Sequence, residues 1–177
     1  MTLLSLNSYQ DLLFKCEFEL EKLQNCSTHP DYDFILFNIV IGLNHLFDWY
    51  LKEEDLTEEQ KINCINSFNP YQSLDRVSRE FKSLYRKIEN FPQINAYQES
   101  IRDLSNKAKH FNKTQIIEKQ DRNYTVTCGS PLATCGNDKA VSGGFDHYIY
   151  SIKINGSDEN LQQVISALII SWRGFCI

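Results

Sequence analysis

Arg102, Asn106 and His110 follow one another at intervals of four residues in the stretch 93–111. In an α-helix this spacing places the guanidinium, the amide and the imidazole in one line. Cleavage of RNA without a metal needs a base for the 2′-hydroxyl, a cation for the phosphorane and an acid for the leaving oxygen. Histidine titrates near neutral pH, and arginine binds phosphate bidentately. The line therefore fits a site that cleaves or binds a phosphodiester, and it also fits an ordinary solvated helix surface.

A helix over the same stretch must position these side chains. Its apolar residues recur every three or four positions, which is the spacing of one face turned toward a core. This face consists of Ile94, Tyr97, Ile101, Leu104, Ala108 and Phe111. The line from Arg102 to His110 lies almost opposite, so we expect it to face solvent.

A second polar cluster interrupts the most apolar predicted helix, residues 31–52. It consists of Asn44, His45 and Asp48. His45 and Asp48 lie one turn apart, so they could satisfy each other inside the core or act together as a catalytic pair. A buried polar group without a partner would cost about 1–3 kcal/mol.

Charge is unevenly distributed along the chain, whose net charge is −5. Residues 76–122 carry eleven Lys or Arg against six Asp or Glu, a balance of +5, so the remainder carries −10. Such a basic segment can gather a polyanion or dock an acidic partner protein. The cations that we expect to contact RNA are Arg76, Arg79, Lys82, Arg86, Lys107 and Lys109.

Helices account for most of the predicted fold. Ser8 is an N-cap for a helix ending near residue 24, and Thr57 with Gln60 forms a capping box for a helix ending near Phe68. Apolar spacing predicts a fourth helix over 73–89, antiparallel to the fifth. Alternating β-formers predict strands at 121–127 and 146–154, with Asn155-Gly156 ending the second strand and a last helix over 159–173.

These elements predict a mainly α protein with a single domain, 1–177. We expect a five-helix bundle at 8–111, a β-hairpin at 119–155 and a packed C-terminal helix at 158–174. The N-terminus has no signal-peptide pattern, and the longest apolar run is too short and polar to span a bilayer, so we expect a cytoplasmic protein. Six cysteines show no CxxC pair, which predicts free thiols. Cys128, Cys135 and His147 match no metal-ligand spacing, so we expect neither a metal nor a cofactor.

Three segments carry a family resemblance. The run IRDLSNKAKHF, together with LNHLFDWY on the preceding apolar helix and SWRGF at the end of the last one, resembles an uncharacterised branch of the HEPN-like all-helical bacterial proteins. This resemblance implies a homodimeric, metal-independent ribonuclease of a toxin–antitoxin or phage-defence system, with RNA and an operon-encoded protein as partners. It implies that Arg102 stabilises phosphate, that Asp103 is the polar residue beside it, and that His110 is the acid or base. The alternative is a non-enzymatic helical interaction module with a basic docking face.

Overall fold

Three helices form the body of the molecule and begin and end close to where the sequence predicts. The computed structural model describes residues 6–26, 30–109, 117–119, 124–125, 140–141 and 150–176. Helix α1 spans Tyr9–Asn25, α2 spans Asp31–Lys52 and α3 spans Glu58–Phe68. Ser8 and Thr57 cap α1 and α3 in capping boxes with Asp11 and Gln60, as predicted.

The predicted fourth helix over 73–89 is wrong. The segment instead contains a 3₁₀ turn, η1, at Leu74–Arg76 and one short helix, α4, at Lys82–Tyr85. The buried Asn69 fixes this irregular course, because its side chain binds the backbone at Tyr71 and Pro92 and accepts a hydrogen bond from the Tyr85 hydroxyl. Val77, Phe81 and Tyr85 are still buried at four-residue intervals, so the apolar spacing marks a core contact without a continuous helix.

Helix α5 spans Ala96–Lys109, and its orientation differs from the prediction. The buried side chains are Gln98, Ile101 and Ser105, whereas Ile94 is exposed and Leu104 is half-buried. Gln98 causes this rotation: its Nε2 donates to the Leu43 carbonyl at 3.2 Å, and its Oε1 accepts from Trp172 Nε1 at 3.1 Å. Arg102 is consequently half-buried against α2 instead of facing solvent.

The antiparallel hairpin exists, but its strands differ from those predicted. Strand β4, Tyr150–Ile154, pairs with β1, Ile117–Lys119, on one side and with β5, Ser157–Asn160, on the other. Asn155-Gly156 ends strand β4, as predicted: both residues have positive φ, 52° and 85°, and they form a two-residue hairpin turn that leads into the unpredicted strand β5. Strand β2, Tyr124–Thr125, pairs in parallel with β3, Ala140–Val141, so in the described part of the chain β4 has β1 as its antiparallel partner and not the predicted strand 121–127.

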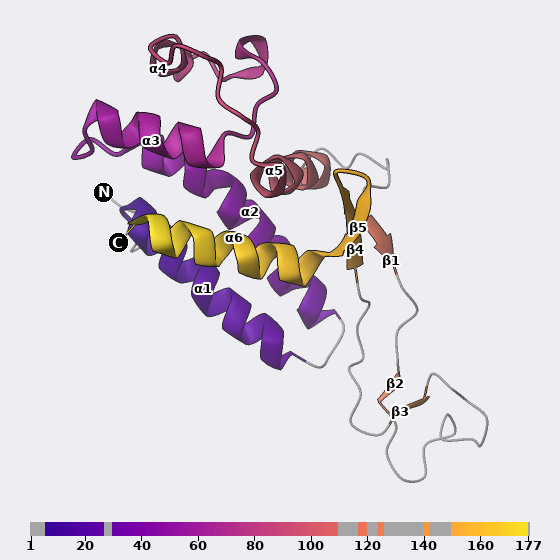
Figure 1. The fold of residues 1–177 in the computed structure, drawn as a ribbon. Helices are drawn as coiled ribbons and strands as arrows, with labels where there is room; N and C mark the ends of the chain where they lie inside the picture. The colour runs from indigo at the N-terminus through magenta and orange to yellow at the C-terminus, as the bar shows by residue number, and fades with distance from the viewer. Residues whose placement is uncertain are drawn as a thin grey trace.

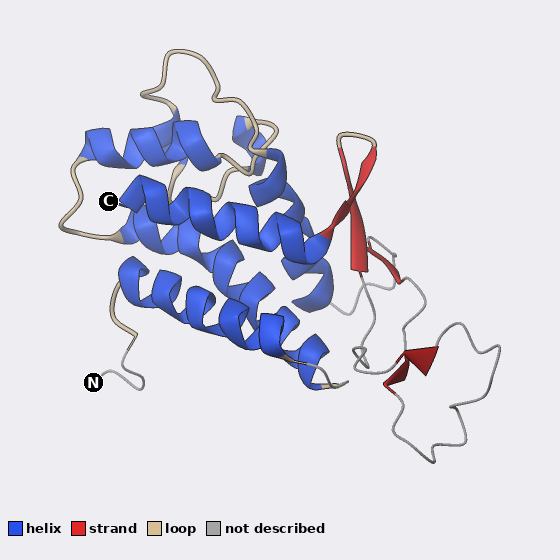
Figure 2. Ribbon diagram, turned by 60° about the horizontal axis from the view of Figure 1, so that its bottom comes forward, coloured by secondary structure: helices blue, strands red, loops and turns tan. Residues whose placement is uncertain are grey.

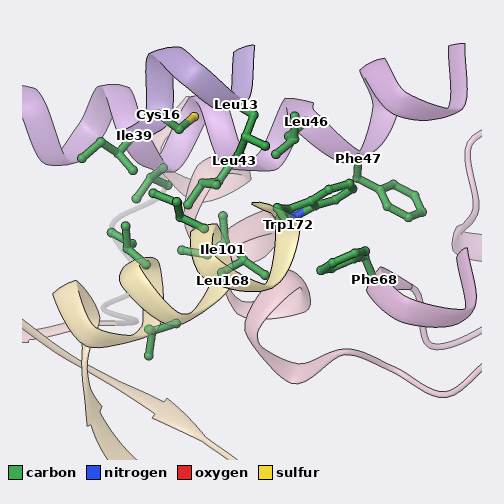
Figure 3. Packing of buried hydrophobic residues seen from close by; sticks show 14 of the residues in the cluster. Leu13, Cys16, Ile39, Leu43, Leu46, Phe47, Phe68, Ile101, Leu168 and Trp172 are labelled. Carbon is green, nitrogen blue, oxygen red and sulfur yellow. The ribbon is translucent and has the colours of Figure 1, made fainter. Parts of the chain in front are cut away.

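Helix α6, Leu161–Cys176, completes the core and confirms the predicted packed C-terminal helix. It lies across α1 and α2, with the three-stranded sheet at the end of the bundle where α6 begins (Figures 1 and 2). Trp172 is fully buried and stacks on Phe68 of α3, with ring centroids 3.9 Å apart (Figure 3). One apolar cluster joins residues from all these helices and from β4, so the protein is mainly helical with a single core.

Helix α2 is the central helix, as its composition predicts. Its 22 residues are long and apolar enough to cross a membrane by length and composition, and no other helix in the described part of the chain is. However, 56% of its apolar window is buried inside the protein, so α2 serves as a core helix.

Candidate functional site

Polar side chains gather where the C-terminal half of α2 meets α5. On α2, His45, Asp48 and Lys52 lie within about 60° of one another around the helix axis. Gln98 and Ile101 of α5 pack against α2, so α5 lies alongside these three residues. We call His45, Asp48, Arg102 and Lys109 the α2–α5 site.

His45 and Lys109 make the direct contact across this site. Lys109 Nζ lies 2.9 Å from His45 Nε2. An ammonium group can only donate, so Nε2 must accept, which assigns the imidazole proton to Nδ1. Burial first, and then the nearby Lys109 charge, hold the pKa of His45 below its ordinary value. The imidazole is therefore neutral at pH 7 and is able to take up a proton.

Arg102 lies over an aromatic ring. Its guanidinium carbon is 4.5 Å from the ring centroid of Tyr71, which is buried in the loop after α3. A cation over a ring face is stabilised by about 0.5–2 kcal/mol, depending on its exposure to water. Asn69 holds Tyr71 at both its backbone N–H and its carbonyl, with distances of 3.0 and 2.9 Å. The guanidinium is therefore pre-positioned.

Asp48 is half-buried, and burial is the main reason that its pKa lies above the usual carboxyl value. Arg102 exerts the strongest opposing attraction, followed by His45 and Lys52. Among the residues that the structure describes, Asp48 Oδ1 and the buried Asn44 Oδ1 have no hydrogen-bond partner. The predicted mutual satisfaction of His45 and Asp48 is therefore not observed. Buried polar atoms of this kind cost stability and are typical of functional sites.

Residues from the two predicted clusters thus meet in part. Arg102 and Lys109 from the basic stretch lie beside His45 and Asp48 from α2, while Asn106 and Lys107 are half-buried on α5. His110 directly follows Lys109 and lies outside the described residues.

The remaining predicted RNA-binding cations lie on the irregular segment after α3. Arg76, Arg79 and Arg86 are exposed, and Lys82 is half-buried. Lys52 links this segment to the α2–α5 site, because its Nζ lies 3.2 Å from Glu80 Oε1. These four cations therefore belong to the same segment of the chain as Glu80.

Sequence reasoning missed Tyr71 and Asn69. Neither belongs to a motif, and Tyr71 reaches Arg102 only because the chain turns back between α3 and α5. The only signal was Asn69-Pro70, a dipeptide typical of turns.

Within the described ranges, no group of three or more His, Cys, Asp or Glu side chains could hold a metal ion. Cys128, Cys135 and His147 lie outside those ranges. Comparisons with family models, curated proteins and solved structures found no match. The α2–α5 site itself combines an imidazole, two cations and a carboxylate.

Proposed function

We propose that the protein is a cytoplasmic, HEPN-like endoribonuclease or RNA-binding effector that needs no metal and that serves a bacterial defence or toxin–antitoxin system. The observation that carries the proposal is the meeting of a neutral imidazole, His45, with the cations Arg102 and Lys109 in one site. Metal-free RNA cleavage needs a base and positive charge together at one phosphate.

In the proposed reaction, His45 Nε2 takes the proton of a 2′-hydroxyl. The 2′-oxygen then attacks phosphorus and forms a 2′,3′-cyclic phosphate, while the bond from phosphorus to the 5′-oxygen breaks. The leaving oxygen receives a proton from His110, the acid that the family resemblance implies. Lys109 must release Nε2 before the reaction, and its ammonium and the Arg102 guanidinium then bind the charged phosphate oxygens.

The decisive experiment follows cleavage of single-stranded RNA in EDTA. We expect His45→Ala to lower the rate by about 10²–10⁴-fold, the usual value of a general base. Arg102→Ala should lower the rate by about 10²–10³-fold. Arg102→Lys should also be impaired, because lysine lacks the planar fork that covers Tyr71 and binds phosphate bidentately.

Lys153→Ala is the matched control, because Lys153 is an exposed cation of β4. It should leave the rate unchanged. All variants should keep the wild-type melting temperature to within a few degrees. Wild-type protein that cleaves no RNA, or a His45→Ala variant that is as active as the wild type, would contradict the enzymatic proposal.

A second candidate function, a protein-interaction module, is favoured by the outer face of α1 and α6. Phe14, Phe18 and Ile170 are 69%, 50% and 69% exposed there, around a hollow of about 370 Å³. Apolar patches of this kind often mark protein contacts. We assign to this face the contact with a second copy of the chain, or with an operon-encoded partner, that the resemblance implies. The exposed arginines of 76–86 would suit a different, acidic partner. Phe18→Glu should dissociate such an assembly in sedimentation velocity, and an unchanged sedimentation coefficient would exclude this face.

A further inference from the structure

The polar site continues into an apolar stripe along α2. Phe34, Phe37 and Ile41 lie on the same side of α2 as His45 and Lys52, within about 80° around the axis. Phe34 is 62% exposed and Phe37 is 48% exposed, although both are large aromatic side chains. One face of α2 therefore changes from aromatic to charged along its length.

A pocket of about 190 Å³ opens beside Phe37. Val40 of α2 and Leu104 and Ala108 of α5 line it with apolar side chains, and Tyr150 of β4, whose hydroxyl donates to Asp33, lines it as well. A cavity of about 150 Å³ holds one benzene ring, so this pocket has room for one flat ring. Ala108 directly precedes Lys109, so the pocket adjoins the α2–α5 site.

We propose that the substrate is single-stranded RNA and that Phe37 stacks on one of its bases in this pocket, with Phe34 as a second stacking surface. This inference rests on the proposed function, because it takes the α2–α5 site as the place where the phosphate binds. Eight residues separate Phe37 from His45, about 12 Å along the helix. The stacked base therefore belongs to a neighbouring nucleotide, not to the one that is cleaved.

Two properties of the surface select this ligand. The faces of bases in a duplex are covered by their neighbours, so an aromatic side chain can stack only on an unpaired base. The cations Arg102, Lys109 and Lys52 lie around His45, at the end of the stripe. Aromatic surfaces next to positive charge are the usual arrangement for binding single strands. A purely apolar protein partner would leave these charges without a counterpart.

The test measures equilibrium binding by fluorescence anisotropy of a short single-stranded RNA with 2′-O-methyl groups. This probe has no free 2′-hydroxyl and is not cleaved, so binding is separated from catalysis. We expect Phe37→Ala to weaken binding by about 5- to 160-fold, which is the 1–3 kcal/mol of one base–aromatic stack. Phe37→Trp should preserve binding, whereas Phe37→Leu should lose most of it, because leucine is apolar but cannot stack.

Ile94→Ala is the control, since it removes an exposed apolar side chain that belongs neither to the α2 stripe nor to the face of α1 and α6, and it should leave the affinity unchanged. Replacing bases one at a time by an abasic spacer should identify one position whose loss is not additive with Phe37→Ala. A duplex of the same sequence should bind more weakly than the single strand.

Three results would overturn the inference. If Arg102→Ala loses binding while Phe37→Ala binds like the wild type, the site binds phosphate but the stacking assignment fails. If Phe37→Ala instead alters only the sedimentation coefficient, the stripe is a protein contact. If the wild type binds no RNA, both this inference and the proposed function fail.

Discussion

Asn69 is the residue whose replacement should disturb most of the molecule around the candidate site. Its side chain is fully buried and makes four well-formed hydrogen bonds: to the Tyr71 and Pro92 carbonyls, from the Tyr71 N–H and from the Tyr85 hydroxyl, all between 2.8 and 3.0 Å. At about 0.5–1.5 kcal/mol net each, these bonds contribute about 2–6 kcal/mol. We expect Asn69→Ala to lower the free energy of unfolding by about 4 kcal/mol.

Urea denaturation measures this loss directly, and thermal melting should show it as a fall of about 8–16 °C for a domain of this size. Tyr85→Phe removes only one of the four bonds, so it should cost about 1 kcal/mol. Asn66→Ala is the matched control, because Asn66 is exposed on α3 and its loss should stay within about 0.5 kcal/mol.

Asn69→Ala should also weaken RNA binding. Asn69 fixes the Tyr71 ring on which the Arg102 guanidinium lies, so its loss should displace the guanidinium. A loss below about 1 kcal/mol for Asn69→Ala would show that the loop holds its course by apolar packing of Val77, Phe81 and Tyr85 alone, and would refute this reasoning.

Two further predictions concern α2. A Cβ added at Gly42 would lie 2.7 Å from Cys16 Sγ, so Gly42→Ala should destabilise the wild type by about 1 kcal/mol despite its gain in helix propensity. In a Cys16→Ala background the same substitution should stabilise the protein. Urea denaturation measures both effects, and equal effects in the two backgrounds would contradict the clash. Because the pKa of His45 is lower in the folded than in the unfolded state, the unfolded chain binds more protons below pH 6.5, and stability should fall as the pH drops from 7.5 to 5. The slope from this one residue is at most about 1.4 kcal/mol per pH unit, and His45→Gln should remove it; identical pH profiles for the two proteins would exclude the assigned burial.

The helices were predictable where local chemistry determines them. Ser8 and Thr57 mark the first turns of their helices, because each side chain accepts a hydrogen bond from the backbone N–H three residues later. The apolar spacing of α6 identifies its six buried side chains. Residues 73–89 were not predictable, because four-residue spacing of Val77, Phe81 and Tyr85 satisfies a core without requiring a continuous helix. Asn155-Gly156 is a dipeptide typical of two-residue hairpin turns. Strand β5 was not predicted, because the residues that follow this turn are polar.

The site was predictable in its parts and not in its assembly. Arg102, Lys109, His45 and Asp48 were all recognised as chemically capable residues. Their meeting depends on how α5 is rotated against α2, and this rotation is set by Gln98, a polar residue that binds Leu43 and Trp172 inside the core. Amphipathic spacing assigns such a residue to the solvent side, so the sequence pattern identified Ile101 and Leu104 as core-facing but not the buried Gln98 and Ser105.

The position of Trp172 has a consequence for the order in which the chain can fold. The ring that covers Phe68, and the indole N–H that satisfies Gln98, both come from α6, which follows α5 in the chain only after the strands of the sheet. Until α6 has packed against them, α1, α2, α3 and α5 share an uncovered apolar surface and an unpaired amide oxygen. The helices that precede α6 in the chain therefore cannot complete their core before α6 has docked on them.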